Sequence, residues 1–350
     1  MRRDPFRAPA FPRRSTANPI PPSLSLPGLY CPLHHMKKLR KPFRGTRRRR
    51  AADRAVADGA GSGWHAARSG RLTLLRATAL EHLHWLVHGF STRTGGASLL
   101  GEARVLNLGS TEWDTTEAVE ANRAAFLRAL GAGRAWLVPQ RQCHTDLIHR
   151  LDAVPAHPPR GDALITRAPG LLLAVKTADC VPILLADRRN RAVAAVHAGW
   201  RGTLARIAEK TLGRMKMEFD TRAEDVVAAL GPAIGGCCYE VGPEVAQAFA
   251  AQFADAREWF EGPFERLAGG HDPAPFPWLS MTPPGHEAPA PRVHLDLRAA
   301  NRRQLQAAGV PAAQIVSSAL CTACRTDLFF SHRRERGRTG RLMAVIGIRE

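Results

Sequence analysis

The stretch LLLAVKTADCVPILLADRRNRAVAAVHAGWRG, residues 171–202, contains three short apolar runs that are separated by charged or turn residues. Runs of this length without polar alternation are typical of strands that are buried on both faces of a sheet. The turn GWRG leads into TLARIAEKTLGRMKMEF (203–219), in which apolar residues repeat at helical spacing. This stretch of the chain therefore predicts a core of buried strands that is covered by a helix.

Strands and helices are also predicted on both sides of this stretch. We expect strands near residues 85–90 and in AWLVPQRQCH (135–144), DVVAALGPAIGG (225–236) and RLMAVIGI (341–348). We expect helices in TTEAVEANRAAFLRAL (115–130), PEVAQAFAAQF (243–253) and LRAANRRQLQAAG (297–309), the first with Asp114 or Thr115 as its N-cap. Residues 262–291 are rich in Pro, Gly and His and indicate an inserted loop. The mixture of elements predicts an α/β or α+β fold in a single domain.

Positive charge is concentrated at the N-terminus. The chain has a formal net charge of +19, yet residues 1–50 hold 14 of its 50 Lys and Arg and only one of its 31 acids, Asp4. We expect the Pro- and Arg-rich tail, residues 1–70, to be disordered. It could be an organellar transit peptide or an RNA-binding tail, or the start codon could lie upstream of a true initiator at Met36. The remaining domain, residues 71–350, is mildly basic, so nucleic acid is not its expected ligand.

The cysteines indicate a reducing compartment. The chain has seven of them, including the adjacent pair Cys237 and Cys238 and the CTAC motif with Cys321 and Cys324. An odd number without framework spacing favours free thiols and a cytoplasmic location. One CxxC without a second ligand pair is insufficient for a zinc knuckle, so we interpret Cys321 and Cys324 as free thiols and the adjacent pair as packing thiols. No run approaches the roughly 18 uncharged apolar residues of a membrane span, so no membrane partner is expected.

Three residues at predicted strand ends could bind a metal. Cys180 follows LLLAVKTAD, His197 ends AVAAVH, and His144 ends a third predicted strand. A catalytic zinc usually has three protein ligands of this kind and one open position. From the residues alone, each could equally be an inert buried side chain, and Cys180 with His197 could be a nucleophile and its base.

Eight motifs in order resemble those of the bacterial polyphenol-oxidase or laccase-domain family, whose members are described as zinc-dependent purine nucleoside phosphorylases. These are HGFSTRTGG, LNLG, QCH, DALITRAPGLLLAVKTADCVPILLAD, AVAAVHAGWRGT, LGPAIGGCCYEVG, HLDLRAANRRQL and FFSHRRERGRTGR, between about residues 80 and 348. The resemblance implies packed mixed β-sheets flanked by helices. It also implies zinc as the metal, with His144, Cys180 and His197 as its ligands.

The resemblance further implies phosphorolysis of adenosine, inosine, guanosine and methylthioadenosine, with deamination of adenosine as a second activity. Asp179 is the candidate for proton transfer in deamination, or it caps the local structure. Arg93 and Arg201, each in a Gly-bearing turn, are candidates for binding phosphate. Asn107 and Tyr239 could hydrogen-bond ribose or base, or fix a loop. The basic segment 331–341 is interpreted as structural or phosphate-facing.

The chain also departs from the family pattern. A Cys precedes the ligand in QCHTD, Thr145 stands where Gly is common, and STEWD after LNLG lacks a His that is often found there. These changes could alter the preference for substrate. Two other enzyme classes compete with the main hypothesis. One is a copper-dependent phenol oxidase, which would need several coppers and further His ligands, for which the chain offers the HLH motif at 82–84. The other is a cysteine hydrolase that uses Cys180 and His197. The oligomeric state cannot be inferred.

Overall fold

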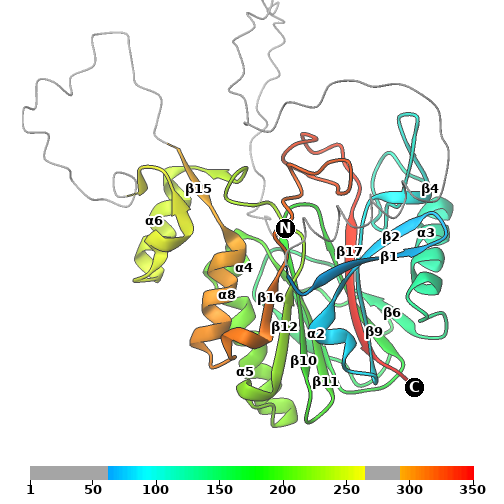
Figure 1. Ribbon diagram of the computed structural model, residues 1–350, viewed down its shortest axis with the longest axis horizontal. Helices are drawn as coiled ribbons and strands as arrows, with labels where there is room; N and C mark the ends of the chain where they lie inside the picture. The colour runs from blue at the N-terminus through cyan, green and yellow to red at the C-terminus, as the bar shows by residue number, and fades with distance from the viewer. Residues whose placement is uncertain (1–61, 265–291) are drawn as a thin grey trace, which may run out of the picture. The chain divides into compact units, whose positions relative to one another are not determined.

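Two six-stranded mixed sheets form the centre of the fold in the computed structural model, which describes residues 62–264 and 292–350 (Figure 1). The first sheet has the order β1-β2-β3-β17-β9-β6 and the second has the order β16-β12-β10-β11-β8-β7. The strands of the first sheet are β1 Trp64–Ser69, β2 Leu72–Ala77, β3 Leu86–Ser91, β17 Leu342–Ile348, β9 Leu171–Thr177 and β6 Trp136–Pro139. Those of the second are β16 Ile315–Ser317, β12 Val226–Leu230, β10 Val181–Asp187, β11 Ala192–Ala198, β8 Ala163–Thr166 and β7 Ile148–Arg150.

The two sheets pack face to face, and their inner faces share one apolar cluster. Side chains from β9 and β17, such as Val175 and Ile346, belong to the same cluster as Leu184 of β10 and Val193 of β11. On the other face of the second sheet, Ile183 belongs to a second cluster. Both faces of β10 are therefore covered, which explains why its sequence VPILLAD has no polar alternation.

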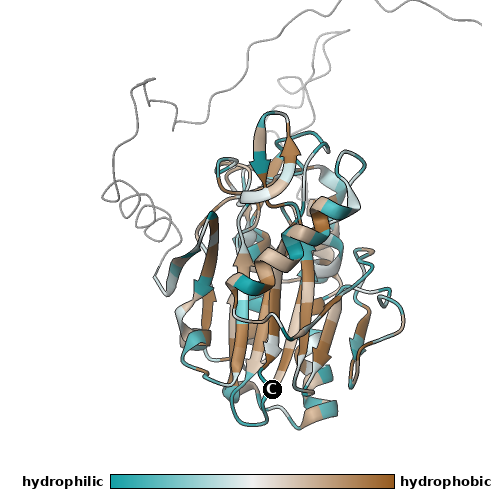
Figure 2. Ribbon diagram, turned by 90° about the vertical axis from the view of Figure 1, so that its right-hand side faces the viewer, coloured by the Kyte–Doolittle hydropathy of each residue, from teal (hydrophilic) through white to brown (hydrophobic). Residues whose placement is uncertain are grey.

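Helices cover the outer faces of both sheets. The helices α5, Ile207–Phe219, and α8, Leu297–Ala307, pack on the second sheet. The helix α3, Thr116–Ala129, packs on the first sheet, on the opposite side of the molecule (Figure 1). In Figure 2 the strands are mainly brown, whereas the helices carry teal stretches that face solvent. The layers are thus helix, sheet, sheet and helix, which confirms the predicted α/β class with packed mixed sheets.

Shorter elements complete the described segments of the chain. They are the helices α2 Thr78–Glu81, α4 Trp200–Leu204 and α6 Pro243–Gln252, the pair β4 Thr94–Leu100 and β5 Ala103–Val105, the small sheet of β13 Glu240–Val241, β15 Val293–Leu295 and β14 Phe260–Glu261, and 3₁₀ turns at Ala223–Asp225, Ala256–Trp259 and Ala312–Gln314. Among the described residues, no helix has both the length and the apolar character needed to cross a membrane.

Most predicted elements are present, with one break. The helix α3 begins after Thr115, whose side chain accepts a hydrogen bond from the backbone N–H of Ala118, so Thr115 and not Asp114 is the N-cap. The predicted helix 203–219 is instead divided into α4 and α5. Arg206 lies between them with φ of 60°, a left-handed conformation that a continuous helix cannot contain.

The domain begins earlier than the predicted boundary at residue 71. The strand β1 pairs with β2 in register, from Trp64 opposite Ala77 to Ser69 opposite Leu72. Trp64 is buried, and its ring makes an edge contact with Phe90 at a centroid distance of 5.1 Å. The prediction of a disordered tail for residues 1–70 therefore does not hold for this strand. The rest of that tail, residues 1–61 with the Met36 alternative, and residues 265–291 of the predicted inserted loop lie outside the described residues.

Candidate metal centre

The three predicted ligands converge at one end of the central strands β10 and β11 of the second sheet. Cys180 directly precedes β10, and His197 lies in β11, where it is the register partner of Pro182. The Sγ atom of Cys180 is 4.0 Å from Nε2 of His144, and one ligand atom from each of the three residues lies within 4.8 Å of the others. Antiparallel pairing of β10 with β11 thus makes neighbours of two residues that are far apart in sequence.

The sequence had suggested that His144 lies at the end of a strand, but a loop positions it. The strand β6 ends at Pro139, and His144 follows in the connection to β7. Its φ of 58° is a left-handed conformation that is unfavourable for a residue with a Cβ atom. The surrounding hydrogen bonds must therefore stabilise this backbone geometry.

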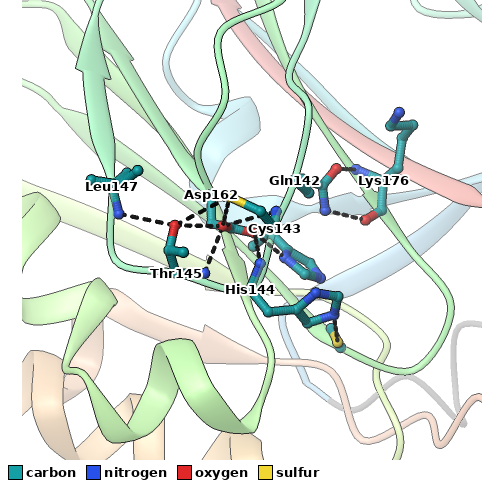
Figure 3. A network of polar contacts seen from close by, with 9 residues as sticks. Gln142, Cys143, His144, Thr145, Leu147, Asp162 and Lys176 are labelled. Atoms are coloured by element: carbon teal, nitrogen blue, oxygen red, sulfur yellow. Dashed lines mark hydrogen bonds and ion pairs between the residues drawn. The ribbon is translucent and has the colours of Figure 1, made fainter. Parts of the chain in front are cut away.

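The carboxylate of Asp162 provides these hydrogen bonds (Figure 3). It accepts hydrogen bonds from the backbone N–H groups of Cys143 at 3.2 Å, His144 at 3.1 Å and Thr145 at 2.7 Å. The hydroxyl of Thr145 donates a further one at 2.9 Å. Three successive amides around one anion form a backbone nest, which fixes the left-handed turn at His144.

Asp162 also orients the second histidine. Its Oδ1 atom lies 2.8 Å from Nδ1 of His197, and both side chains are buried. An ionised carboxylate only accepts, so Nδ1 of His197 carries the proton and Nε2 is left to face a metal. Hydrogen bonds of this kind, which a ligating histidine donates to a carboxylate, are a common support of metal sites. Sequence reasoning missed Asp162, although it lies in the quoted motif DALIT.

Charges at the centre are strongly coupled. Burial alone raises the pKa of the Cys180 thiol, but the adjacent His197 charge and the contact with His144 outweigh it and lower the pKa to about 6. Burial alone lowers the pKa of His197, but the Cys180 charge and the Asp162 hydrogen bond raise it to about 9. The pKa of Asp162 is held well below its usual range, against the effect of burial, by the His197 and Thr145 hydrogen bonds. Cys180 is therefore a thiolate at neutral pH.

Gly199 leaves the space that the ligands occupy. A Cβ atom at this position would lie 3.0 Å from Sγ of Cys180 and 3.1 Å from Cδ2 of His144. Both distances are shorter than ordinary van der Waals contact, so a larger residue would displace a ligand. This explains the glycine at the N-cap of α4.

One thiolate and two imidazoles fit a transition-metal ion. Three protein ligands and an open side toward solvent are typical of catalytic zinc, while a trigonal site of two His and one Cys also suits copper. A multicopper oxidase needs further His-rich sites. In residues 62–264 and 292–350, the other convergent group of three or more potential ligands consists of four cysteines. His82 and His84 of the HLH motif are exposed and belong to neither group. The donor set therefore fits a single transition-metal ion, and the described residues offer no further His-rich site of the kind that a copper cluster needs.

A cavity of about 610 Å³ adjoins the three ligands. Five cationic side chains line it, and within the described segments of the chain none of them forms an ion pair with a carboxylate. These are Arg141, Lys176, Arg201, Arg333 and Arg341. Burial and the neighbouring charges of Arg123 and Arg341 lower the pKa of Lys176. Such an excess of positive charge favours an anionic ligand.

Arg201, Asp179 and Tyr239, three residues singled out from the sequence, line this cavity. Arg201 stacks on the ring of Trp200 at 4.4 Å. Asp179 is buried and accepts hydrogen bonds from the Thr322 hydroxyl at 2.6 Å and the Arg333 backbone N–H at 2.7 Å. Burial raises the pKa of Tyr239 to about 12, so its hydroxyl stays protonated at neutral pH. The roles assigned to these residues stay predictions.

Arg93 and Asn107 are not among the residues that line the cavity. The guanidinium of Arg93 pairs with Glu335 at 2.9 Å and lies over the ring of Phe330. Asn107 is buried; its amide donates to Asp114 at 2.7 Å, and its oxygen accepts from the backbone N–H of Arg341 at 2.8 Å. For Asn107 these contacts correspond to the loop-fixing alternative.

Two of the lining cations, Arg141 and Lys176, were missed from sequence. Arg333 and Arg341 belong to the basic segment 331–341, which fits its interpretation as phosphate-facing. Lys176 lies within β9, and a single charged residue in an apolar strand does not by itself indicate a binding site. Gln142 ties the His144 loop to this strand, because its amide both donates to Lys176 O at 2.7 Å and accepts from Lys176 N at 2.8 Å (Figure 3).

Comparison with known proteins gives consistent matches. The family described as multi-copper polyphenol oxidoreductase laccase matches residues 87–349. A purine nucleoside phosphorylase of Deinococcus radiodurans is 38% identical over 281 residues, covering 79% of this chain and 93% of that protein. The adenosine deaminase RL5 of an unknown prokaryotic organism is 40% identical over 185 residues, 53% of this chain and 61% of that protein. The crystal structure of YlmD from Geobacillus stearothermophilus has a TM-score of 0.66 at 33% identity and covers 81% of this chain and 99% of that one.

Replacing Asp162 by Asn should weaken metal binding by about 10- to 100-fold, the usual effect of losing such a supporting carboxylate. The amide cannot accept from all the donors that now face the carboxylate, so the His144 turn and the His197 tautomer lose their support. Zinc affinity is measured by chelator competition, with thermal unfolding as a check on folding. Asp220→Asn, at an exposed position, is the matched control. Equal zinc affinity in both variants would contradict this role.

Zinc affinity should also depend on pH. A metal binds the thiolate and the neutral imidazole, so protons compete with it at both residues. Because the pKa of Cys180 is about 6, affinity should fall steeply as the pH drops below this value. Because the pKa of His197 is about 9, a proton should still be released on binding at neutral pH. Competition titrations of metal-free protein between about pH 5 and 8 measure both effects; a flat profile would contradict the assignment.

Proposed function

Because the chain belongs to the family described as multi-copper polyphenol oxidoreductase laccase, we propose that it is a zinc-dependent purine nucleoside phosphorylase with adenosine deaminase activity. The observation that carries this proposal is the cavity, in which five cations that form no ion pair within the described residues adjoin the His144, Cys180 and His197 ligand set. Phosphorolysis needs cations of this kind, because a phosphate must be held beside the nucleoside.

Phosphate binding falls to the cations of the cavity. Burial, together with the nearby charges of Arg123 and Arg341, lowers the pKa of Lys176, and a bound phosphate would relieve the repulsion between these cations. Arg201 adds a guanidinium from the HAGWRG turn. The pairing of Arg93 with Glu335 makes it the weaker candidate, although the sequence places it in a similar turn.

The nucleoside would occupy the region of the cavity beside the ligand set. Trp200 and Tyr239 supply aromatic surface there, and the protonated Tyr239 hydroxyl can donate to a ribose or base atom. Adenosine, inosine, guanosine and methylthioadenosine are the substrates we propose, since the cavity of about 610 Å³ falls in the range usual for small-molecule sites.

Zinc held by His144, Cys180 and His197 would supply Lewis-acid chemistry at this edge of the cavity. The protein's own contribution is to hold the ligands, to bind phosphate and to move protons. Asp179 is the only carboxylate among the lining residues in the described segments of the chain, so proton transfer during deamination would fall to it. Its hydrogen bonds to Thr322 and Arg333 support the alternative, a positioning role.

Two other assignments have specific merits. A cysteine hydrolase is supported by the arrangement of Cys180, His197 and Asp162, which resembles a thiolate, base and orienting carboxylate. It leaves the convergence of His144 unexplained. A copper-dependent phenol oxidase would use the same three ligands, but the described residues of this chain hold no further His clusters for it.

A cytoplasmic location is supported by the six unpaired cysteines of the described segments.

Incubation of metal-replete protein with adenosine and phosphate tests the proposal, with products followed by chromatography. Adenine or hypoxanthine together with ribose 1-phosphate is expected from phosphorolysis, and inosine from deamination. Turnover should stop when a chelator removes the metal and return with zinc. No turnover of any purine nucleoside by metal-replete protein would overturn the proposal. Turnover that survives complete metal removal, or covalent trapping of substrate on Cys180, would favour the hydrolase.

Replacing Lys176 by Met should raise KM for phosphate by about tenfold or more, because a charge-assisted hydrogen bond contributes about 1.5–3 kcal/mol. Deamination needs no phosphate and should change little. Lys216→Met, at an exposed position of α5, is the matched control and should leave both activities intact. Initial rates at varied phosphate concentration measure the effect. An unchanged KM for phosphate in Lys176→Met would exclude this residue from the phosphate site.

A further inference from the structure

Four cysteines form a second convergent group outside the centre described above. Cys237 and Cys238 lie in the turn between β12 and β13, and Cys321 and Cys324 lie between β16 and β17. The four Sγ atoms lie within 4.8 Å of one another. The sequence offered a single CxxC motif without a second ligand pair; the fold supplies that pair from a turn more than 80 residues away.

The distances between the sulfur atoms fit a tetrahedral site. The Sγ atom of Cys324 is 3.4 Å from that of Cys238 and 3.6 Å from that of Cys237, and the adjacent pair is separated by 3.8 Å. Zinc–sulfur bonds of about 2.3 Å in a tetrahedron place the sulfurs roughly 3.8 Å apart. A cluster of several iron atoms needs more widely spaced ligands, because its cysteines bind different irons. The group therefore has room for one ion.

Disulfide formation explains this group less well. A disulfide joins two sulfurs at about 2.05 Å, whereas Cys324 lies at nearly equal distances from Cys237, 3.6 Å, and Cys238, 3.4 Å, so the geometry selects neither pair for a disulfide. In addition, the backbone N–H of Gly235 donates to Sγ of Cys321 at 3.2 Å in a buried position. Such a hydrogen bond stabilises a thiolate, the form in which cysteine binds a metal.

We propose that Cys237, Cys238, Cys321 and Cys324 bind a structural zinc ion. Four protein ligands leave no open position, so this ion would be structural and not catalytic. The inference does not depend on the proposed function, because it uses none of the residues assigned to that function.

This ion would join the two segments that build one wall of the cavity. Cys238 is followed by Tyr239, and the segment after Cys324 carries Arg333, whose guanidinium lies over the Tyr239 ring at 5.2 Å. Between Cys321 and Cys324, Thr322 donates to Asp179. Loss of the ion should therefore loosen the wall that holds Tyr239 and Arg333, while the ligand set of His144, Cys180 and His197 keeps its own metal.

Metal content of the full-length chain tests the site. Protein that is purified and dialysed should contain about two zinc ions per chain by elemental analysis, one for each ligand set. The double variant Cys238→Ser, Cys324→Ser should contain about one, and Cys31→Ser, a matched control outside the described residues, should keep both. Equal zinc content in wild type and double variant would overturn the proposal, as would one equivalent of iron in place of zinc.

Thiol reactivity in the wild-type protein gives a test that does not depend on the folding of a variant. Cys237 and Cys324 are exposed, so as free thiols they should be alkylated at once. As zinc ligands they should be protected and become reactive when a chelator is added, as peptide mass spectrometry can follow. Immediate alkylation of zinc-replete protein would overturn the proposal. If these thiols became reactive only after a reductant was added, they would be in a disulfide, and the proposal would also be overturned.

Discussion

Asp162 carries its negative charge in a position closed to solvent, where the amides of residues 143–145 and the imidazole of His197 surround it. This contact joins the His144 loop to β11, and so it joins two of the three ligands. A buried carboxylate that lost these donors would be costly, because burial makes a poorly compensated charge unfavourable. The left-handed backbone at His144 is stable for the same reason.

The sheets determine where this carboxylate lies. Asp162 precedes β8, and its carbonyl accepts a hydrogen bond from the N–H of His197 at 2.7 Å, next to the pair Ala163 and Val196. Burial on both faces sets the register of β10 and β11, since a shift by one residue would turn apolar side chains into the wrong layer. The packing of the sandwich thus places Cys180 and His197 side by side, and Lys176 of the first sheet lines the same cavity.

Elements with strong local signals could be predicted from sequence. The buried runs of β10 and β11, the helix α3 after its Thr115 cap and the final strand β17 are examples. The predictions that failed did so for local reasons that the pattern of apolar residues does not reveal. Arg206 takes a left-handed conformation and divides the predicted helix 203–219, and β1 is short and only partly buried, so its sequence carries little apolar signal.

The sequence by itself determined the donor types of the metal site and, through its ordered motifs, the family to which they belong. Only the tertiary structure decided what supports and surrounds them. Asp162, Lys176 and the four cysteines have no periodic signal, because their partners lie tens of residues away in sequence and meet them only after the sheets have packed. Hydrogen bonds and metal ligands act over a few ångströms in space, and sequence spacing does not measure that distance.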